Sequence, residues 1–188
     1  VDNFQWVPLT IGEYRLEVAA DCLSVNGVRL PVSFANVVAM CAKQDMLPNT
    51  KAIVDARWNA GEKRIVLRTR PPNNRGPDAT LVREVKEWSG KMGPLSRSLI
   101  GGPWKEWVLD DVKQPGNATN YGLWGPNGKP IQSLGHRHPD FHVDDSQMFA
   151  PVRRKATKNG VQIDLLDELA KGSPLGGPLP KWLVEKLK

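Results

Sequence analysis

Alternating apolar and polar residues dominate the first third of the chain. Strand-like runs at 14–18 and 23–25 are followed by the dipeptide Asn26-Gly27 and another run at 28–32. Asn-Gly between alternating apolar runs is the strongest short hairpin signal, because both residues tolerate a positive φ. The pattern therefore predicts a β-hairpin centred on this dipeptide.

Helical spacing of apolar residues follows the hairpin. Ser33 is typical of a helix N-cap, Pro48 interrupts the chain, and Gly61 has the composition of a helix end. The spacing predicts helices over about 34–44, 50–60, 79–88 and 161–170.

Short strands separated by turn residues are predicted between these helices, over 106–109, 120–124, 131–134 and 141–149. The segment 125–130 has the composition of a turn, so the strands on either side of it are expected to pair as antiparallel neighbours. The fold class expected is α+β, with an N-terminal β-hairpin and helix pair packed on a small antiparallel sheet that carries the histidine residues.

The chain is expected to form one α+β domain over residues 1–171. Residues 172–188 are predicted to be a Gly/Pro linker and a short amphipathic tail. We expect this tail, which begins near Trp182, to dock on the domain, with a protein partner as the alternative use of its apolar side.

Charge narrows the class of partner. The 188 residues include 26 Lys and Arg against 20 Asp and Glu, a net charge of +6, which favours anionic polymers such as those of the bacterial cell wall. Zinc-finger and helix-turn-helix patterns are lacking, so nucleic acid is not favoured. Without a run of 18 apolar residues, no membrane span is expected. Cys22 and Cys41 form no metal-type or redox-type doublet.

All three histidines, His136, His138 and His142, fall within seven positions, close to Asp144. If the residues on both sides of His138 form strands, His136 shares a face with His138, and His142 shares a face with Asp144. Together these four side chains would supply the ligands of a zinc site. A metal site, a metal-free acid–base site and an inert turn all remain open at this point.

The metal-free alternative assigns His142 as a general base oriented by Asp144 or Asp145, with Tyr121 as proton donor and Arg137 or Arg153 as the group that stabilises an anion. The signatures of zinc proteases and of serine hydrolases are not present.

Further candidates lie close to these in the sequence. His136 and Ser146 are added to the catalytic set, and Trp124, Gln132 and Gln147 to the substrate-binding set. Trp104 and Trp107 flank the same region, and aromatic faces beside polar groups are typical of a carbohydrate groove.

Two segments carry a resemblance to a known family. They are Leu-Pro-Asn-Thr…Val-Asp-Ala at 47–56, and Asn-Tyr-Gly-Leu-Trp at 120–124 with Ile-Gln at 131–132 and His-Val-Asp-Asp-Ser-Gln at 142–147. They are similar to the Leu-Pro-Thr…Val-Asp-Ala-Ile, Tyr-Gly-Trp-His, Ile-Gln-Pro and His-Val-Asp-Tyr-Ser-His motifs of a largely uncharacterised family of exported bacterial and phage-encoded proteins. The similarity covers about residues 20 to 155.

This resemblance implies a shared functional surface and a cellular location, but no particular reaction. It groups His142, Asp144, Ser146, Tyr121 and Gln132 on one functional surface and points to the bacterial envelope or a phage. This chain departs from the motifs where Leu-Trp replaces Trp-His and where Tyr and His of the last motif become Asp and Gln. Two potential catalytic groups of the pattern are therefore missing.

The function expected is that of an exported hydrolase or lyase that acts on peptidoglycan. Two alternatives remain. One is a non-catalytic protein of a virion or cell envelope, and the other is a zinc-dependent peptidase.

Overall fold

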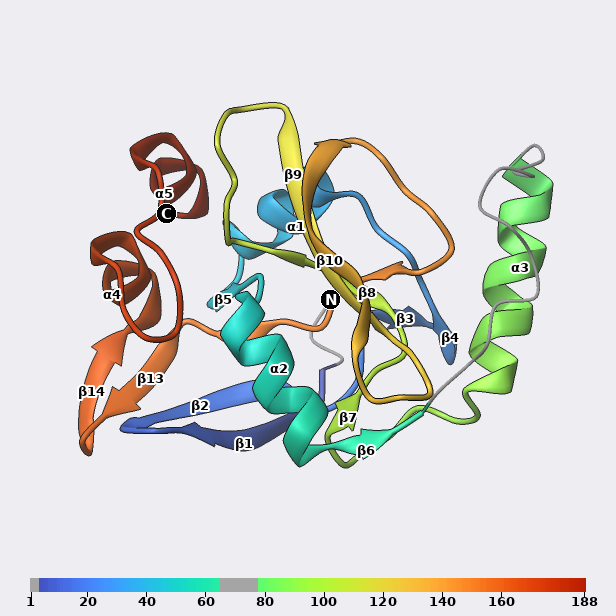
Figure 1. Ribbon diagram of the computed structural model, residues 1–188, viewed down its shortest axis with the longest axis horizontal. Coiled ribbons are helices and arrows are strands. Elements are labelled where there is room, and N and C mark those ends of the chain that lie inside the picture. Colours follow the sequence, from blue (N-terminus) through green and yellow to red (C-terminus); the bar gives the residue numbers. More distant parts are fainter. Residues whose placement is uncertain (1–3, 65–77) are drawn as a thin grey trace.

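The computed structural model describes residues 4–64 and 78–188, and within them it leaves out the side chains of 78–82 and 136–137 (Figure 1). The described residues combine five helices with strands in mostly antiparallel sheets. The predicted α+β class is confirmed.

A six-stranded sheet underlies the N-terminal and C-terminal parts of the chain. Its strands are β1 (Trp6–Ile11), β2 (Tyr14–Ala19), β5 (Met46–Leu47), β12 (Val152–Arg153), β13 (Lys155–Lys158) and β14 (Val161–Asp164). β2 pairs with β1 on one side and with β12 and β13 on the other. β1 was not predicted, and it is an edge strand, which is where a sheet tolerates a residue such as Pro8 that has no backbone N–H.

A four-stranded sheet carries the central part of the chain. It contains β8 (Lys105–Val108), β9 (Asn117–Trp124), β10 (Pro130–Pro139) and β11 (Gln147–Met148) in the order β10-β9-β8-β11. β9 and β10 pair antiparallel, as predicted for the strands around 125–130. β11 pairs parallel with β8, so β10 and β11 lie at opposite edges of the sheet.

The predicted strand over 141–149 is therefore wrong in most of its length. Only Gln147–Met148 is a strand, and residues 140–146 form a crossover segment that leads from one edge of the four-stranded sheet to the other (Figure 1). The backbone groups at the start of the crossover segment form hydrogen bonds other than those of a strand pair. Asp140 donates to the Gly116 carbonyl and accepts from the Ala35 N–H, and His142 donates to the Pro139 carbonyl.

The predicted hairpin is confirmed as β3 (Ser24–Val25) and β4 (Val28–Arg29), with positive φ at Asn26 and Gly27. A second short pair, β6 (Glu62–Lys63) and β7 (Ile100–Gly101), is parallel and was not predicted.

Five helices complete the described residues: α1 (Phe34–Cys41), α2 (Lys51–Ala60), α3 (Asp78–Lys91), α4 (Leu165–Lys171) and α5 (Lys181–Leu187). The first three agree with the predicted positions, although α1 ends about one turn earlier than expected. Ser33 caps α1 as predicted, because its side chain accepts a hydrogen bond from the backbone of Asn36.

The helix predicted over 161–170 begins four residues too early. Residues 161–164 form β14, which folds back on β13 through Asn159-Gly160, both with positive φ. The helix starts only after Asp164, whose carboxylate accepts a hydrogen bond from the Leu166 backbone. The same Asn-Gly signal that predicted the first hairpin was overlooked here.

The main hydrophobic core lies between the six-stranded sheet and helices α1, α2, α4 and α5, and includes Leu16, Val18 and Ile53. Leu183 and Leu187 of the C-terminal tail are buried in it, so the expected docking of the tail is confirmed. The apolar side of this tail is thus already occupied within the chain.

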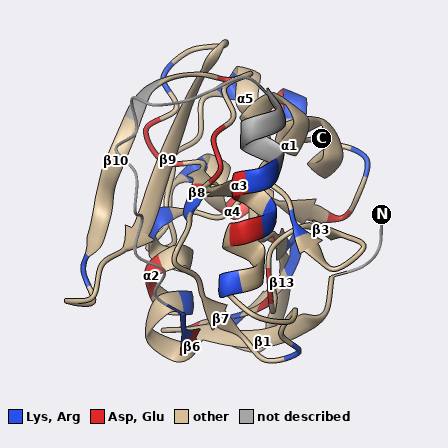
Figure 2. Ribbon diagram, turned by 90° about the vertical axis from the view of Figure 1, so that its right-hand side faces the viewer, with Lys and Arg blue, Asp and Glu red and all other residues tan. Residues whose placement is uncertain are grey.

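Charged side chains are distributed over separate elements, as the sequence indicates, and Figure 2 shows basic and acidic segments interspersed. Among the helices of the described ranges, none has the length and apolar character needed to cross a membrane. Cys22 and Cys41 are buried free thiols.

Candidate functional site

One face of the four-stranded sheet contacts the crossover segment and holds the candidate site. We use the name histidine site for Lys105, His138, His142, Asp144 and Ser146. β8 supplies Lys105, β10 supplies His138, and the crossover segment supplies the other three. Because alternate residues of a strand share a face, Lys105 lies on the same side of β8 as Trp107. The ring of Trp107 contacts the ring of His138, with 6.2 Å between the ring centroids.

Asp144 is the centre of this site. Its side chain is 1% exposed and forms a buried ion pair with the Lys105 ammonium. The other carboxylate oxygen accepts hydrogen bonds from the Ser146 backbone N–H at 2.9 Å and from the Ser146 hydroxyl at 2.8 Å. The backbone N–H of Asp144 donates to Gln147 Oε1 at 2.9 Å. These contacts fix the carboxylate in one orientation.

The ionisation of Asp144 follows from this environment. Burial alone would raise the pKa of its carboxyl, but the Lys105 ammonium and the hydrogen bonds from Ser146 outweigh burial and hold the pKa well below its usual range. The group is therefore a carboxylate throughout the neutral range.

A pH dependence of stability is expected from this shift. Because the pKa of Asp144 is lower in the folded chain than in the unfolded chain, where it is about 3.9, the carboxylate stabilises the fold above about pH 4. That contribution is lost as the pH falls through the folded-state pKa. We expect the free energy of unfolding to fall more steeply below pH 4 in the wild type than in Asp144→Asn, measured by urea unfolding at successive pH values. Parallel curves would contradict this.

His142 is the part of the site that solvent reaches, with 28% of its side chain exposed. Its Nε2 lies 4.0 Å from Asp144 Oδ2, the oxygen that also contacts Lys105. This is an ion-pair distance for a protonated ring, longer than a direct hydrogen bond. The imidazole of His138 stacks on that of His142, with centroids 4.8 Å apart and planes 19° apart.

This contact between His142 and Asp144 agrees with the predicted pairing but has a different origin. The prediction placed both residues on one strand, whereas they lie in the crossover segment, which is not a β-strand. Lys105 donates its backbone N–H to the Ser146 carbonyl at 2.8 Å, and this bond anchors the end of the segment to β8.

Tyr121 lies on the other face of the sheet. It is the register partner of Glu106, the neighbour of Lys105 on β8, so its side chain points away from the histidine site. Its hydroxyl donates to Asp55 of α2 at 2.7 Å. Burial and this hydrogen bond raise the pKa of Tyr121 well above its usual value. The predicted role of Tyr121 as proton donor beside His142 is therefore wrong.

Tyr121→Phe is expected to leave the rate of any reaction at the histidine site unchanged. The substitution removes the hydrogen bond to Asp55 without touching Lys105, His142 or Asp144, so it lowers the free energy of unfolding by about 1 kcal/mol. Rates and urea unfolding measured side by side check this expectation. A loss of turnover beyond about tenfold in a folded variant would place Tyr121 in the reaction after all.

The tryptophans do not form the expected carbohydrate groove. Trp104 and Trp107 are each 1% exposed and Trp124 is 7% exposed. The ring of Trp124 stacks on Trp58 of α2 at 4.4 Å with planes 5° apart, on the Tyr121 side of the sheet. Protein atoms cover these rings, so the expectation that they stack on a sugar is wrong.

Other predicted residues are more scattered. Gln132 donates to the carbonyl of its neighbour Ser133 at 3.0 Å. Arg153 belongs to the six-stranded sheet, where its guanidinium lies over the Trp6 ring and 3.4 Å from Glu17, apart from the histidine site. The side chains of His136 and Arg137 lie outside the described part of the chain, so the predictions made for them stay predictions.

Gln147 and Asn120 are fully buried on the face of the sheet that holds the histidine site. They are the register partners of Lys105 and Trp107, and partners share a face. Among the described residues, Gln147 Nε2 and both amide atoms of Asn120 have no hydrogen-bond partner. Buried polar groups of this kind are normally satisfied by ordered water or by a ligand. Asn120 was not predicted as a site residue.

A metal site has limited support. Within the part of the chain that is described, no group of three or more His, Cys, Asp or Glu side chains is arranged to hold a metal ion. Since the His136 side chain is outside that part, the four-ligand zinc site of His136, His138, His142 and Asp144 stays an untested prediction.

Lys105 and Phe141 were missed by the sequence analysis. Lys105 and Glu106 form a charged pair inside the otherwise apolar run from Trp104 to Leu109, and this pair is a signal that was available. Phe141 is 75% exposed next to His142. An aromatic residue that remains exposed in a folded chain cannot be recognised from its sequence alone.

Comparisons with protein-family models, with curated proteins and with solved structures give no match to this chain. A functional assignment therefore depends on the geometry of the histidine site.

Proposed function

We propose that the protein is a hydrolase or lyase that acts on the anionic polymer of the bacterial cell wall, peptidoglycan, with His142 as its general acid–base. The observation that carries this proposal is the order of charges in the histidine site. A partly exposed imidazole lies against a buried carboxylate, and that carboxylate is paired with a buried ammonium.

The buried ion pair has a cost that stability alone does not explain. Removing a carboxylate and an ammonium from water is unfavourable, and apolar residues of similar size often stabilise a fold as well or better. Such a pair beside a titratable side chain is typical of a functional site. Here the Asp144 carboxylate of the pair supplies a fixed negative charge, and Nε2 of His142 faces it.

The proton-transfer step follows from this orientation. With Nε2 toward Asp144, Nδ1 is the ring nitrogen of His142 to which we assign the acceptance of a proton from an attacking water or a substrate hydroxyl. Asp144 stabilises the imidazolium that forms, and it stays ionised because Lys105 keeps its pKa low. The stacked ring of His138 limits the orientations of His142. The same imidazolium can then return the proton to the leaving group.

Two features support a cell-wall polymer as the substrate. The net charge of +6 attracts an anionic polymer. Phe141, exposed beside His142, offers an aromatic face of the kind on which sugars stack, in place of the buried tryptophans. The resemblance to exported bacterial and phage-encoded proteins is consistent with this substrate and with an envelope or phage setting.

Purified peptidoglycan tests the proposal. We expect the protein to release soluble fragments. These carry new reducing ends if a glycosidic bond is hydrolysed, non-reducing anhydro ends if a lyase cleaves that bond by attack of a substrate hydroxyl, and new amino groups if a peptide bond is hydrolysed. Chitin, a neutral polymer, serves as the control and is expected to be cleaved more slowly. The absence of soluble fragments would contradict the proposal and favour the non-catalytic envelope or virion protein.

A further inference from the structure

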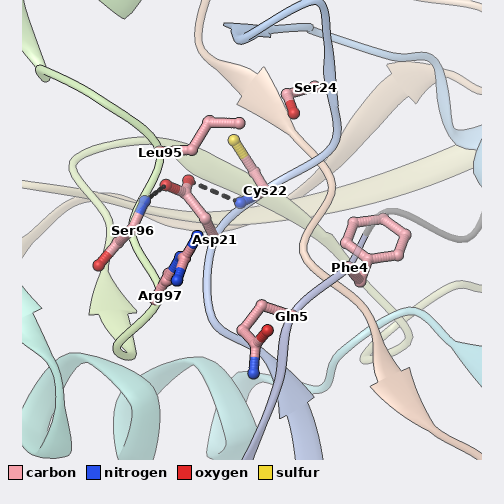
Figure 3. A pocket seen from close by; sticks show the side chains of 8 residues that line it. All are labelled: Phe4, Gln5, Asp21, Cys22, Ser24, Leu95, Ser96 and Arg97. Atoms are coloured by element: carbon pink, nitrogen blue, oxygen red, sulfur yellow. Dashed lines mark hydrogen bonds between the residues drawn. The ribbon is translucent and has the colours of Figure 1, made fainter.

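A pocket of about 370 Å³ lies away from the histidine site and shares no residue with it. Figure 3 shows its walls, which come from the segment before β1, the turn after β2 with the start of β3, and the loop before β7. The residues that line it are Phe4, Gln5, Asp21, Cys22, Ser24, Leu95, Ser96 and Arg97.

Asp21 joins two of these walls, the turn after β2 and the loop before β7. Its carboxylate is bound by the buried guanidinium of Arg29 through two hydrogen bonds, at 2.9 and 2.6 Å. It also accepts the backbone N–H groups of Cys22 at 2.8 Å and Ser96 at 2.9 Å, both visible in Figure 3. Arg29 in turn donates to the carbonyl of Pro94. The pocket is thus formed before any ligand arrives, which reduces the ordering that binding requires.

The charge in the pocket is positive. The charge of Asp21 is matched by Arg29, whereas Arg97 is exposed and has no ion-pair partner among residues 4–64 and 78–188. A guanidinium offers a planar set of N–H donors that fits a carboxylate.

The rest of the lining is partly apolar. Leu95 is 39% exposed, and Phe4 is half-buried on the opposite side of the pocket in Figure 3. The Cys22 thiol is 3% exposed, and burial raises its pKa well above the usual value, so it is a neutral part of the wall.

We infer that this pocket binds a small organic anion whose carboxylate pairs with Arg97 and whose apolar part lies between Phe4 and Leu95. This binding activity goes beyond the proposed action on peptidoglycan and does not depend on it.

Benzoate is a suitable probe, with benzamide as the uncharged ligand of the same shape. In two-dimensional NMR titrations we expect benzoate to shift the backbone amide signals of Cys22, Ser24 and Ser96 in a saturable way, with a Kd in the millimolar range, as expected for so small a ligand. Arg97→Gln is expected to weaken binding about tenfold, because a charge-assisted pair is lost.

Arg83→Gln, which removes an exposed arginine of α3, is the matched control and is expected to bind benzoate like the wild type. Equal binding of benzoate and benzamide would overturn the inference, as would unchanged affinity in Arg97→Gln or shifts that do not saturate at these three amides.

Discussion

Replacing Lys105 with Met is expected to lower the free energy of unfolding by about 3–5 kcal/mol. The substitution keeps the length of the side chain but leaves the Asp144 carboxylate, which is 1% exposed, without its ammonium partner. Breaking a buried ion pair from one side is among the most damaging single changes in a protein, because the remaining charge stays buried after losing its partner. Urea unfolding at pH 7 measures the effect.

Two further variants make this result specific. Lys113→Met removes a lysine whose side chain is 65% exposed and is expected to change the stability by less than about 0.5 kcal/mol. In Lys105→Met with Asp144→Asn both charges are absent, and the amide oxygen can still accept the hydrogen bonds from Ser146. We expect this double variant to recover more than half of the loss. If it is no more stable than the single variant, the ion pair is not what the site depends on.

Replacing His142 with Ala is expected to lower the rate of peptidoglycan cleavage about 10²- to 10⁴-fold, the usual contribution of a general acid–base. Because 28% of the side chain is exposed, the fold is expected to survive the change. The rate of appearance of new ends in the polymer measures turnover, and urea unfolding measures stability in the same preparation.

His138→Ala is the matched control for this experiment. It removes the ring that stacks on His142 but leaves His142 and Asp144 in place, so a loss of less than about tenfold is expected. Equal losses in the two variants would assign the effect to the stacked pair as a whole and not to proton transfer by His142.

Local patterns predicted the local structure correctly. Asn26-Gly27 gave the first hairpin and Ser33 the start of α1, because each signal depends only on the conformational preferences of a few adjacent residues. The turn over 125–130 likewise gave the antiparallel pair β9 and β10.

Long-range pairings were beyond the sequence pattern. β11 joins β8 in parallel at the far edge of the sheet from β10, so residues 140–146 must cross between the edges instead of continuing as a strand. This path brings His142 to Asp144 and places both beside Lys105, a residue 37 positions earlier than His142 in the chain. Spacing within the histidine motif could not predict Lys105 as a member of the site.

Tyr121 illustrates the same limit. It is close to Gln132 and His142 in the family motifs, but the face of β9 on which it lies is set by its pairing with Glu106. A shift of one residue in that register would have turned it toward the histidine site. Sequence proximity therefore grouped side chains that the sheet separates.

The most direct test of the central claim is the rate at which His142→Ala cleaves peptidoglycan with and without added imidazole. If His142 transfers protons beside the Asp144–Lys105 pair, the variant is nearly inactive alone, and free imidazole restores part of the rate in proportion to its concentration. A variant that cleaves the polymer at the wild-type rate, or one whose loss imidazole does not relieve, would contradict the account.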